Sequence, residues 1–335
     1  MKAVAYRQSL PIEAAESLMD VTLPEPTPGP RDLLVRVHAI SVNPVDTKVR
    51  KRAAPPAGEH KVLGWDAAGV VEAVGAQVTL FKPGDKVWYA GDVTRPGSNA
   101  ELHCVDERIV GPMPASLSFA EAAALPLTAI TAWEVLFDRL EVKADTPGAL
   151  LIVGAAGGVG SIMTQLARQL TGLTVVGTAS RPQTQAWVRE LGAHHVIDHA
   201  KPLSEELARV GVPAVTHVAS LTQTHLHYAE IVKALAPQGR LSLIDDPAQP
   251  LDVMLLKGKS LSLRWESMFT RSMFQTPDMQ AQHDLLKQVS QLVDAGRLRT
   301  TLGEHFGAIN AANLKRAHAF IESGTARGKV VLEGF

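Results

Sequence analysis

The sequence predicts an α/β protein that combines a strand-rich region with a doubly wound parallel sheet. Three observations predict this fold class. Residues 1 to about 120 are dense in Val, Ile and aromatic residues, interrupted by Gly, Pro and Asp, which is typical of β-strands. From Ala149 onward, short apolar runs alternate with segments of helical periodicity, as in βαβ units. At the start of that alternation, the segment LIVGAAGGVGS places a glycine-rich turn between an apolar run and a helical one.

The length and composition indicate two domains and a small-molecule partner. The chain has 335 residues, of which 46% are hydrophobic, and its net charge is −1. Because the chain has no net positive charge to attract polyanions, we expect neither a nucleic acid nor a membrane as partner. The single cysteine, Cys104, excludes an internal disulfide and a multi-cysteine metal site, and suits a reducing compartment. With no cationic and apolar leader, and no run of about 18 apolar residues, a cytoplasmic protein is expected.

The first region predicts strands and then a helix. We expect a strand at the N-terminus, in MKAVAYRQ. Further strands are expected in DLLVRVHAISVN and AAGVVEAVGAQVTLFKPGDKVWYA, and the proline-rich LPEPTPGP separates the early strands. The periodicity alone indicates no more than a generic β-barrel. From about Leu117 the segment SFAEAAALPLTAITAWEVLFDRL has apolar residues at helical spacing, and we expect Pro126 to interrupt the helix.

The second region predicts six parallel strands, the number that a doubly wound nucleotide domain uses. Helices are expected between most of them, for example at Gln183–Leu191 and Leu226–Leu235. Residues 266–335 are mixed and end in GKVVLEG, a strand with which the chain can return to its first domain. The predicted domains are therefore 1–125, 126–265 and the return segment 266–335. The six strands are expected at Ala149–Val153, Leu173–Ala179, His194–Ile197, Ala214–Ala219, Arg240–Ile244 and Leu261–Trp265.

The glycine-rich turn predicts a dinucleotide site. Glycine lets the backbone approach a pyrophosphate closely, and the helix that follows offers free N–H groups and the positive end of its dipole. The GxxGxxG spacing differs from the usual GxGxxG, and glycine and alanine runs also form tight core turns. The strand before the turn, the helix after it and the βαβ units downstream favour coenzyme binding. The residues concerned are Gly154, Gly157, Gly158, Val159 and Gly160.

The end of the second predicted strand favours NADPH as the coenzyme. NAD-specific sites place a carboxylate there for the ribose 2′-hydroxyl. This chain has Ser180 and Arg181 in GTASRPQTQ and no acidic residue. A hydroxyl and a guanidinium would bind a 2′-phosphate, which a carboxylate would repel. The alternative is that Arg181 is only a surface residue.

The sequence resembles the medium-chain dehydrogenase/reductase superfamily over essentially its whole length. It is most similar to the zinc-free quinone oxidoreductase branch, in the subgroup labelled zinc-type alcohol dehydrogenase-like or arginate-lyase-like. The resemblance implies a GroES-like β-barrel catalytic domain with a Rossmann domain inserted before its last segment. It rests on the ordered motifs AISVNPVDTKVR, LGWDAAGVVEAVG, FKPGDKVW, LPLTAITAWE, GAAGGVG, LGAHHVIDH, WESMFTRSMFQTPDM and GKVVLEG.

The same resemblance implies an enzyme that works without zinc. Zinc-using relatives place a Cys where this chain has Asn43 and a His where it has Trp65, and their third ligand falls near Leu127. None of these three side chains is a standard zinc ligand. The structural lobe with four cysteines is also missing.

Several site residues are implied by the resemblance alone. Asn43 and Thr131 are expected to contact the nicotinamide or its ribose. Lys48 is expected to donate a proton or stabilise an oxyanion, and the alternative is a solvated lysine. Asp46 is expected to cap its turn more than to react. The remaining expected coenzyme residues are His199, at the 2′-phosphate, and Lys329.

An apolar stripe at the end of the sixth strand and after it, consisting of Trp265, Met268, Phe269, Met273 and Phe274, predicts the substrate pocket. By resemblance, Trp65, Met268 and Phe269 line it, and the alternative for the stripe is core or dimer interface. An apolar wall suits a quinone or an enone. His225 and His227 have a spacing that suggests a metal, but no acidic or cysteine partner accompanies them. Cys104 is expected to pack in the core.

The function expected from these inferences is hydride transfer from NADPH to a quinone or an α,β-unsaturated carbonyl. Solvent or Lys48 would protonate the resulting enolate oxygen. The alternatives are a non-catalytic NADPH-binding protein, a carbonyl or alcohol dehydrogenase and, last, a lyase. By resemblance we also expect a homodimer that pairs the edge strand Leu261–Trp265 with its copy.

Overall fold

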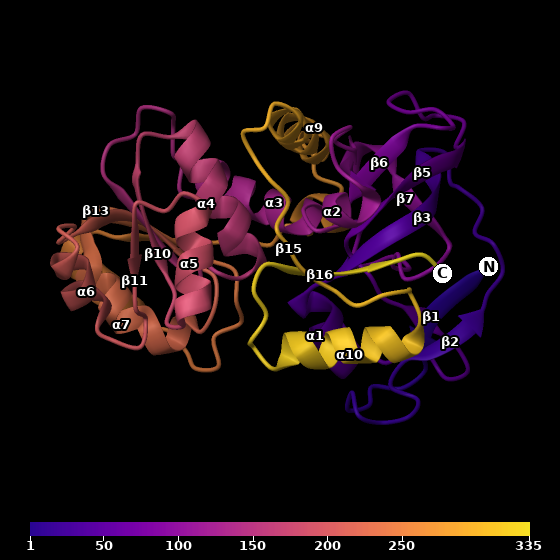
Figure 1. The fold of residues 1–335 in the computed structure, drawn as a ribbon, viewed down its shortest axis with the longest axis horizontal. Coiled ribbons are helices and arrows are strands. Elements are labelled where there is room, and N and C mark those ends of the chain that lie inside the picture. The colour runs from indigo at the N-terminus through magenta and orange to yellow at the C-terminus, as the bar shows by residue number, and fades with distance from the viewer. The chain divides into compact units, whose positions relative to one another are not determined.

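The computed structural model describes residues 1–335, which divide into two compact units (Figure 1). The first unit consists of Met1–Ile130 and Phe269–Phe335, and the second of Thr131–Met268. The chain therefore leaves its first unit and returns to it at the end, in the order that the sequence predicts. The boundaries lie at 130/131 and 268/269, slightly beyond the expected 125/126 and 265/266.

The first unit is built on two sheets whose strands are mostly antiparallel. The predicted N-terminal and C-terminal strands are both present. The C-terminal strand pairs antiparallel with the longest strand of the unit, with Val330 opposite Val42 and Leu332 opposite Ile40. One sheet has the order β2-β1-β4, formed by β1 (Lys2–Tyr6), β2 (Met19–Thr22) and β4 (Lys61–Val62). The other has the order β15-β16-β3-β5-β6-β8, with β7 also paired to β3, and consists of β3 (Asp32–Val42), β5 (Ala67–Val74), β6 (Lys86–Tyr89), β7 (Leu102–Asp106), β8 (Val110–Pro112), β15 (Leu302–His305) and β16 (Lys329–Glu333).

The helices of this unit start and end where the local sequence dictates. Ser118 caps α2 by accepting a hydrogen bond from the N–H of Glu121, and Pro126 begins the next helix, so the predicted interruption is confirmed. Proline favours the first helical position because its missing N–H has no partner there in any case. The helices are α1 (Pro44–Arg52), α2 (Phe119–Ala123), α3 (Pro126–Trp133, which crosses the boundary), α8 (Thr270–Phe274), α9 (Ala281–Asp294) and α10 (Ala311–Glu322), with a 3₁₀ turn at Glu107–Ile109.

The second unit contains one six-stranded sheet that is parallel throughout. Its order is β11-β10-β9-β12-β13-β14, which is the doubly wound arrangement, and all six predicted strands are present. The strands are β9 (Ala149–Val153), β10 (Thr174–Thr178), β11 (His195–Ile197), β12 (Val215–Ser220), β13 (Leu235–Leu243) and β14 (Ser262–Trp265). The helical segments are α4 (Gly158–Leu170), α5 (Pro182–Glu190), α6 (Leu203–Arg209), α7 (Thr224–Ala234), the π-helical Glu134–Arg139 and the 3₁₀ segment Val253–Lys259.

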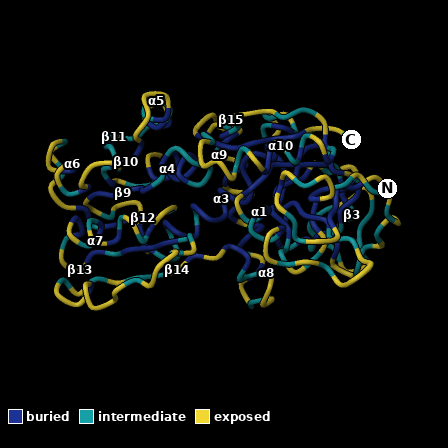
Figure 2. The backbone as a smooth tube through the Cα atoms, turned by 90° about the horizontal axis from the view of Figure 1, so that it is seen from below, coloured by how far each residue is buried: buried dark blue, intermediate teal, exposed yellow.

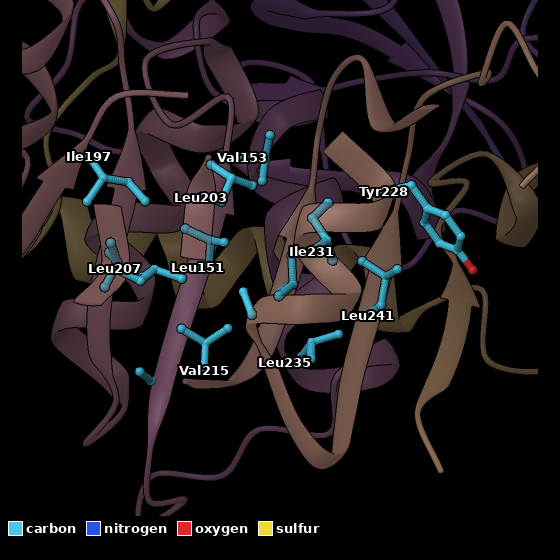
Figure 3. Packing of buried hydrophobic residues seen from close by; sticks show 14 of the residues in the cluster. Leu151, Val153, Ile197, Leu203, Leu207, Val215, Tyr228, Ile231, Leu235 and Leu241 are labelled. Carbon is cyan, nitrogen blue, oxygen red and sulfur yellow. The ribbon is translucent and has the colours of Figure 1, made fainter. Parts of the chain in front are cut away.

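One hydrophobic cluster of the second unit lies between its sheet and helices α6 and α7, and buried residues of α4 and α5 also face the sheet. Every residue of β9 is buried, as a central parallel strand covered on both faces requires. Figure 3 shows Leu151 and Val215 of the sheet beside Leu207 of α6, and Leu241 near Ile231 of α7. In Figure 2 the central strand β9 lies in buried backbone, and exposed residues occur in the loops and on the outer helices α5 and α6.

One helical segment, Phe119–Arg139, has the length and composition of a membrane span. It has 21 residues and is mostly apolar, and 78% of its most apolar part is buried inside the protein. A buried core helix has the same properties, so this segment alone gives no membrane assignment.

Candidate functional site

The glycine-rich turn joins β9 to α4 in the second unit. Gly154 has a φ of 87°, in the left-handed region that favours glycine. A Cβ on Gly160 would lie 2.5 Å from both the Cα of Ala155 and the carbonyl oxygen of Gly154. A Cβ on Gly157 would meet only that carbonyl oxygen, at an ordinary 3.5 Å. The fold therefore requires glycine at 154 and 160, whereas at Gly157 it leaves space in front of the turn.

The start of α4 is suited to an anion. Gly157 is the N-cap residue and has no side chain with which to cap the helix, and the first turn contains no acidic residue. The backbone N–H groups there and the helix dipole favour negative charge. The turn is also anchored to the neighbouring strand, because the N–H of Gly154 donates to the Oγ1 of Thr178 (3.0 Å). A pyrophosphate is the ligand that this arrangement fits.

The residues expected at the 2′-phosphate meet at one end of the sheet. Thr178 of β10 pairs with Ile197 of β11, and Ser180 and His199 each follow two residues after one of these partners, at the same end of the sheet. Ser180 and Arg181 are exposed. The carbonyl of Arg181 accepts hydrogen bonds from the first turn of α5, which fixes the position from which its side chain extends.

Three histidines lie close together at this end of the sheet. The rings of His199 and His227 meet edge to face, with centroids 5.9 Å apart. The Nδ1 atoms of His199 and His225 are buried without a partner in the chain. Burial and these two neighbours lower the pKa of His227. No group of three or more His, Cys, Asp or Glu residues in the protein is arranged to hold a metal ion.

In the first unit, Asn43 belongs to a buried polar network. Its Nδ2 donates to the Oδ2 of Asp66 (2.9 Å) and to the carbonyl of Trp65 (3.3 Å), and its Oδ1 accepts from the Nζ of Lys329. Lys329 also donates to Asp66 (3.0 Å) and to the carbonyl of Val42 (3.2 Å). Asn43 is only 1% exposed and Lys329 only 3%. Both residues expected to contact the coenzyme thus have side chains that are already engaged inside the first unit.

Asp66 is a charged member of this network that the sequence motifs do not single out. Its side chain is fully buried, and its Oδ1 accepts from the N–H of Leu127 (2.8 Å). Burial raises the pKa of Asp66, while Lys329 and the hydrogen bonds oppose that shift. Every partner of the carboxyl group is a donor, so the contacts fit the ionised form. An acidic residue inside the apolar run WDAAGVV was the available signal.

Asp46 and Lys48 both lie on α1. The Oδ2 of Asp46 accepts from the N–H of Asn43 (2.7 Å), so Asp46 caps the helix as expected. Burial raises the pKa of Asp46 to about 7, although that hydrogen bond and Lys329 lower it. Lys48 is half-buried on the same helix. Thr131, which is 5% exposed, belongs to the second unit.

The apolar residues of the expected pocket divide into buried and exposed ones. Trp65 and Phe269 contact edge to face, with ring centroids 6.3 Å apart, and both are buried. Met268 is also buried, whereas Trp265 and Phe274 are 53% and 72% exposed. The stripe is therefore not a continuous part of the core. Cys104 was expected in the core, but it is only half-buried on β7, and burial raises the pKa of its thiol to about 11.

Comparison with known proteins identifies this fold and its glycine turn as those of an oxidoreductase family with a pyridine nucleotide coenzyme. Residues 29–132 match the family model described as alcohol dehydrogenase GroES-like domain, and residues 191–332 the one described as zinc-binding dehydrogenase. A zinc-type alcohol dehydrogenase-like protein of Staphylococcus aureus (strain MSSA476) is 38% identical, over 99% of both chains. A quinone oxidoreductase of Pseudomonas aeruginosa is 32% identical, over 91% of this chain and 92% of its own.

Solved structures agree with this assignment. A Rhizobium etli CFN 42 protein named for the zinc-dependent alcohol dehydrogenases superposes with a TM-score of 0.97 at 61% identity, over 100% of this chain and 98% of its own. The Escherichia coli quinone oxidoreductase complexed with NADPH superposes with a TM-score of 0.84 at 25% sequence identity, over 99% of this chain and 100% of its own. An NAD-dependent alcohol dehydrogenase superposes with a TM-score of 0.84 at 28% sequence identity, over 100% of both chains. The chain belongs to the medium-chain dehydrogenase/reductase superfamily, in its quinone-oxidoreductase-like branch.

The zinc in the names of these relatives does not fit the side chains of this protein. Asn43 presents an amide that is already hydrogen-bonded, and the indole Nε1 of Trp65 donates to the carbonyl of Asp92 (3.1 Å). Leu127 has no donor atom in its side chain. The ammonium of Lys329 lies among these segments, bonded to Asn43 and Asp66. A cation at this position opposes the binding of Zn²⁺.

Proposed function

We propose that this protein is an NADPH-dependent reductase that transfers hydride to a quinone or an α,β-unsaturated carbonyl without zinc. The end of β10 is the observation on which the coenzyme choice rests. Ser180 and Arg181 follow the end of β10, His199 follows the end of the neighbouring strand β11, and no carboxylate is present from Ala179 to Arg181. A guanidinium, a hydroxyl and an imidazole suit a 2′-phosphate, whereas NAD sites use a carboxylate.

The bound nicotinamide would supply the hydride. The chain's own residues would bind the coenzyme, orient the acceptor and supply a proton to it. The glycine turn and the first turn of α4 would hold the pyrophosphate. The coenzyme would supply hydride to the electron-poor carbon of the acceptor, and Lys48 or solvent would donate the proton to the acceptor's oxygen. Trp65 and Phe269, with their rings in edge contact, give the acceptor an apolar wall. Because no zinc Lewis acid is needed to reduce such acceptors, the donor set around Asn43 is compatible with this chemistry.

The experiment is a hydride-transfer assay with the purified protein. We expect NADPH oxidation with quinones and enones, a preference for NADPH over NADH, and no change on adding a chelator. Elemental analysis is expected to show no stoichiometric zinc. Loss of activity on chelation, or tightly bound zinc, contradicts the zinc-free mechanism.

A second candidate is a carbonyl or alcohol dehydrogenase, which the names of the Staphylococcus aureus and Rhizobium etli relatives favour. Aldehydes and alcohols therefore belong in the same panel of substrates. Turnover confined to them would replace the quinone or enone proposal. Coenzyme binding with no turnover on any acceptor would indicate a non-catalytic NADPH-binding protein.

A homodimer is part of the proposal, and the single cysteine suits a cytoplasmic location. Strand β14 is the edge of the second unit's sheet, as predicted, so one side of it has no partner strand in the chain. Trp265 on this strand is 53% exposed, and Val253 and Met254 in the preceding 3₁₀ segment are 63% and 64% exposed. Exposed apolar residues beside a free edge favour strand pairing with a second copy. Light scattering is expected to report a dimer, and a monomer at micromolar concentration would contradict it.

A further inference from the structure

The second unit contains a cavity at the end of its sheet that is opposite to the glycine turn. Its volume is about 310 Å³, which falls within the range of roughly 300–1,000 Å³ that small-molecule sites occupy. The turn 141–147 before β9, the start of β12 and the segment 237–240 of β13 line it. Strand β9 spans about 13 Å from this end to the glycine turn. In Figure 3, Val153 lies at the glycine-turn end of these strands, and Val215 and Leu235 lie at the cavity end.

The backbone around this cavity has conformations that a regular parallel sheet does not require. The pairing of β12 with β13 is irregular here, because Thr216 alone lies opposite the four residues 236–239. Within this bulge Gln238 has a φ of 63°, and Glu141, which also lines the cavity, has a φ of 53°. Bulges and left-handed residues other than glycine occur preferentially at functional sites. The strain at this end of the sheet therefore suggests a functional role.

His217 presents a polar atom to the cavity that it lines. The residue is only 6% exposed, and its Nδ1 lies 2.8 Å from the Oγ1 of Thr216. Its Nε2 has no hydrogen-bond partner in the chain. Burial, together with the nearby Arg240, lowers the pKa of His217 to about 4, so the imidazole is neutral at pH 7. When the hydroxyl of Thr216 donates to Nδ1, the ring proton is on Nε2 and one N–H group is available to a ligand.

Positive charge exceeds negative charge around the cavity. Lys143 lines it with an exposed ammonium that has no ion-pair partner in the chain. Arg240 also lines it, and Arg240 and Arg264 share the carboxylate of Glu141, with N–O distances of 2.6 Å each. These three cations and one anion leave two positive charges in excess. Asp145 in the same turn is exposed and does not line the cavity.

We propose that this cavity is a second ligand site, which binds a small organic anion with a carboxylate or phosphate group. The anionic group would pair with Lys143 and Arg240 and accept the N–H of His217. The uncharged remainder of the molecule would lie against Pro147 and Pro237. A cation would be repelled by the same side chains, and a neutral ligand would leave Lys143 without a partner. The site is separate from the coenzyme site and does not rest on the proposed reaction.

The first experiment measures anion binding by isothermal titration calorimetry at fixed salt. The full-length protein is first saturated with NADPH, or with NADH if NADH binds more tightly, so that the coenzyme occupies its own phosphate site. Glycerol 3-phosphate, glycerate and glycerol are then compared, since they share a three-carbon skeleton and differ in charge. We expect one saturable site per chain for at least one of the two anions, with a millimolar or lower Kd, and no binding of glycerol.

Tighter binding of glycerol 3-phosphate identifies a phosphate ligand, and tighter binding of glycerate identifies a carboxylate ligand. Both results support the site. If neither anion binds saturably to the coenzyme-loaded protein, or if glycerol binds as well as the anions do, the proposal is wrong.

Substitutions then locate the binding. Lys143→Glu and His217→Leu are each expected to weaken anion binding on the order of tenfold. Lys287→Glu is the matched control, because Lys287 is an exposed lysine on α9 of the first unit. It makes the same change in net charge and is expected to leave the Kd within about twofold. Full affinity in Lys143→Glu, or equal weakening by Lys287→Glu, overturns the proposal.

A second experiment tests the charge itself, and it uses the fact that the chain has one cysteine. Lys143→Cys is made in a Cys104→Ser background and alkylated in the folded state with either 2-bromoethylamine or iodoacetamide. The aminoethyl group restores an ammonium of nearly the original length, whereas the amide is neutral. We expect only the aminoethylated protein to recover the anion affinity.

Equal affinity after both reagents would refute the role of Lys143. Position 143 is exposed, so this experiment remains informative if His217→Leu does not fold. Neither experiment uses an acceptor. A protein that reduces no quinone or enone would therefore refute the proposed function and still test the anion site.

Discussion

The coenzyme turn of the second unit and the polar network of the first unit are assembled in opposite ways. The turn, the end of β10 and His199 come from one continuous stretch between Val153 and His199. The network joins Asn43 to Lys329 across 286 residues, and Asp66 to Lys329 across 263. A site made of neighbouring strands depends on backbone geometry, whereas a site made of distant segments depends on buried charge.

This difference predicts different kinds of failure. In the turn, a single added methyl group meets backbone that cannot move cheaply. In the network, a lost charge leaves its partner stranded in a dry interior. The next three predictions concern the turn, the coenzyme phosphate and a buried group away from both sites, in order of decreasing expected effect.

The largest expected effect is that of Gly160→Ala. Its Cβ would lie 2.5 Å from the backbone of Ala155 and of Gly154, so α4 must shift. We expect a loss of about 3 kcal/mol of unfolding free energy together with loss of coenzyme binding. Denaturant unfolding and fluorescence titration with NADPH measure the two effects.

Gly157→Ala is the matched control for the same turn. Its Cβ makes only an ordinary contact, so the unfolding free energy is expected to stay within about 1 kcal/mol of the wild type. The methyl group nevertheless enters the space in front of α4, and NADPH affinity is expected to fall on the order of tenfold. Unchanged NADPH affinity would show that the pyrophosphate does not lie against Gly157.

The next effect concerns the coenzyme phosphate. A charge-assisted hydrogen bond contributes about 1.5–3 kcal/mol, so Arg181→Ala is expected to weaken NADPH binding by about one to two orders of magnitude. NADH lacks the phosphate, and its Kd is expected to change little. Ser180→Asp is expected to shift the preference toward NADH by repelling the phosphate.

Arg189→Ala is the control for charge alone. Arg189 is exposed near the end of α5, the helix that begins directly after Arg181. This substitution is expected to leave both Kd values unchanged at fixed salt. Equal weakening of NADPH and NADH by Arg181→Ala would contradict the 2′-phosphate assignment.

The smallest effect tests a buried group away from both sites. His318 on α10 is fully buried, and burial, with Arg50 nearby, lowers its pKa from 6.5 to about 3. Between these values the unfolded chain binds a proton that the folded protein does not, so stability is lost as the pH falls below 6.5. His318→Leu is expected to reduce the stability difference between pH 7 and pH 5 by about 2 kcal/mol. Identical pH dependence in both proteins, measured by urea unfolding, would refute this assignment.

Particular elements show how far the sequence predicted the fold. Strand β9 was predicted with its observed bounds, because a fully buried parallel strand is a continuous apolar run. Leu235 was expected to end a helix and instead begins β13, since an apolar residue fits either state and the sheet decides between them. Trp265 and Phe274 have large apolar side chains of the kind usually found in a core, and only the structure shows that they are exposed.

The sequence by itself determined the class of protein, the coenzyme turn and the side chains at the end of β10. These features depend on residues that are close in the chain, so their spacing and the local backbone geometry can be inferred from the sequence. Only the tertiary structure decided that Lys329 is an internal cation, that Asp66 joins three segments of the first unit, and that the Asn43 amide is buried and oriented. An ion pair between residues 263 positions apart leaves no local pattern, because its energy depends on burial and on partners that folding alone brings together.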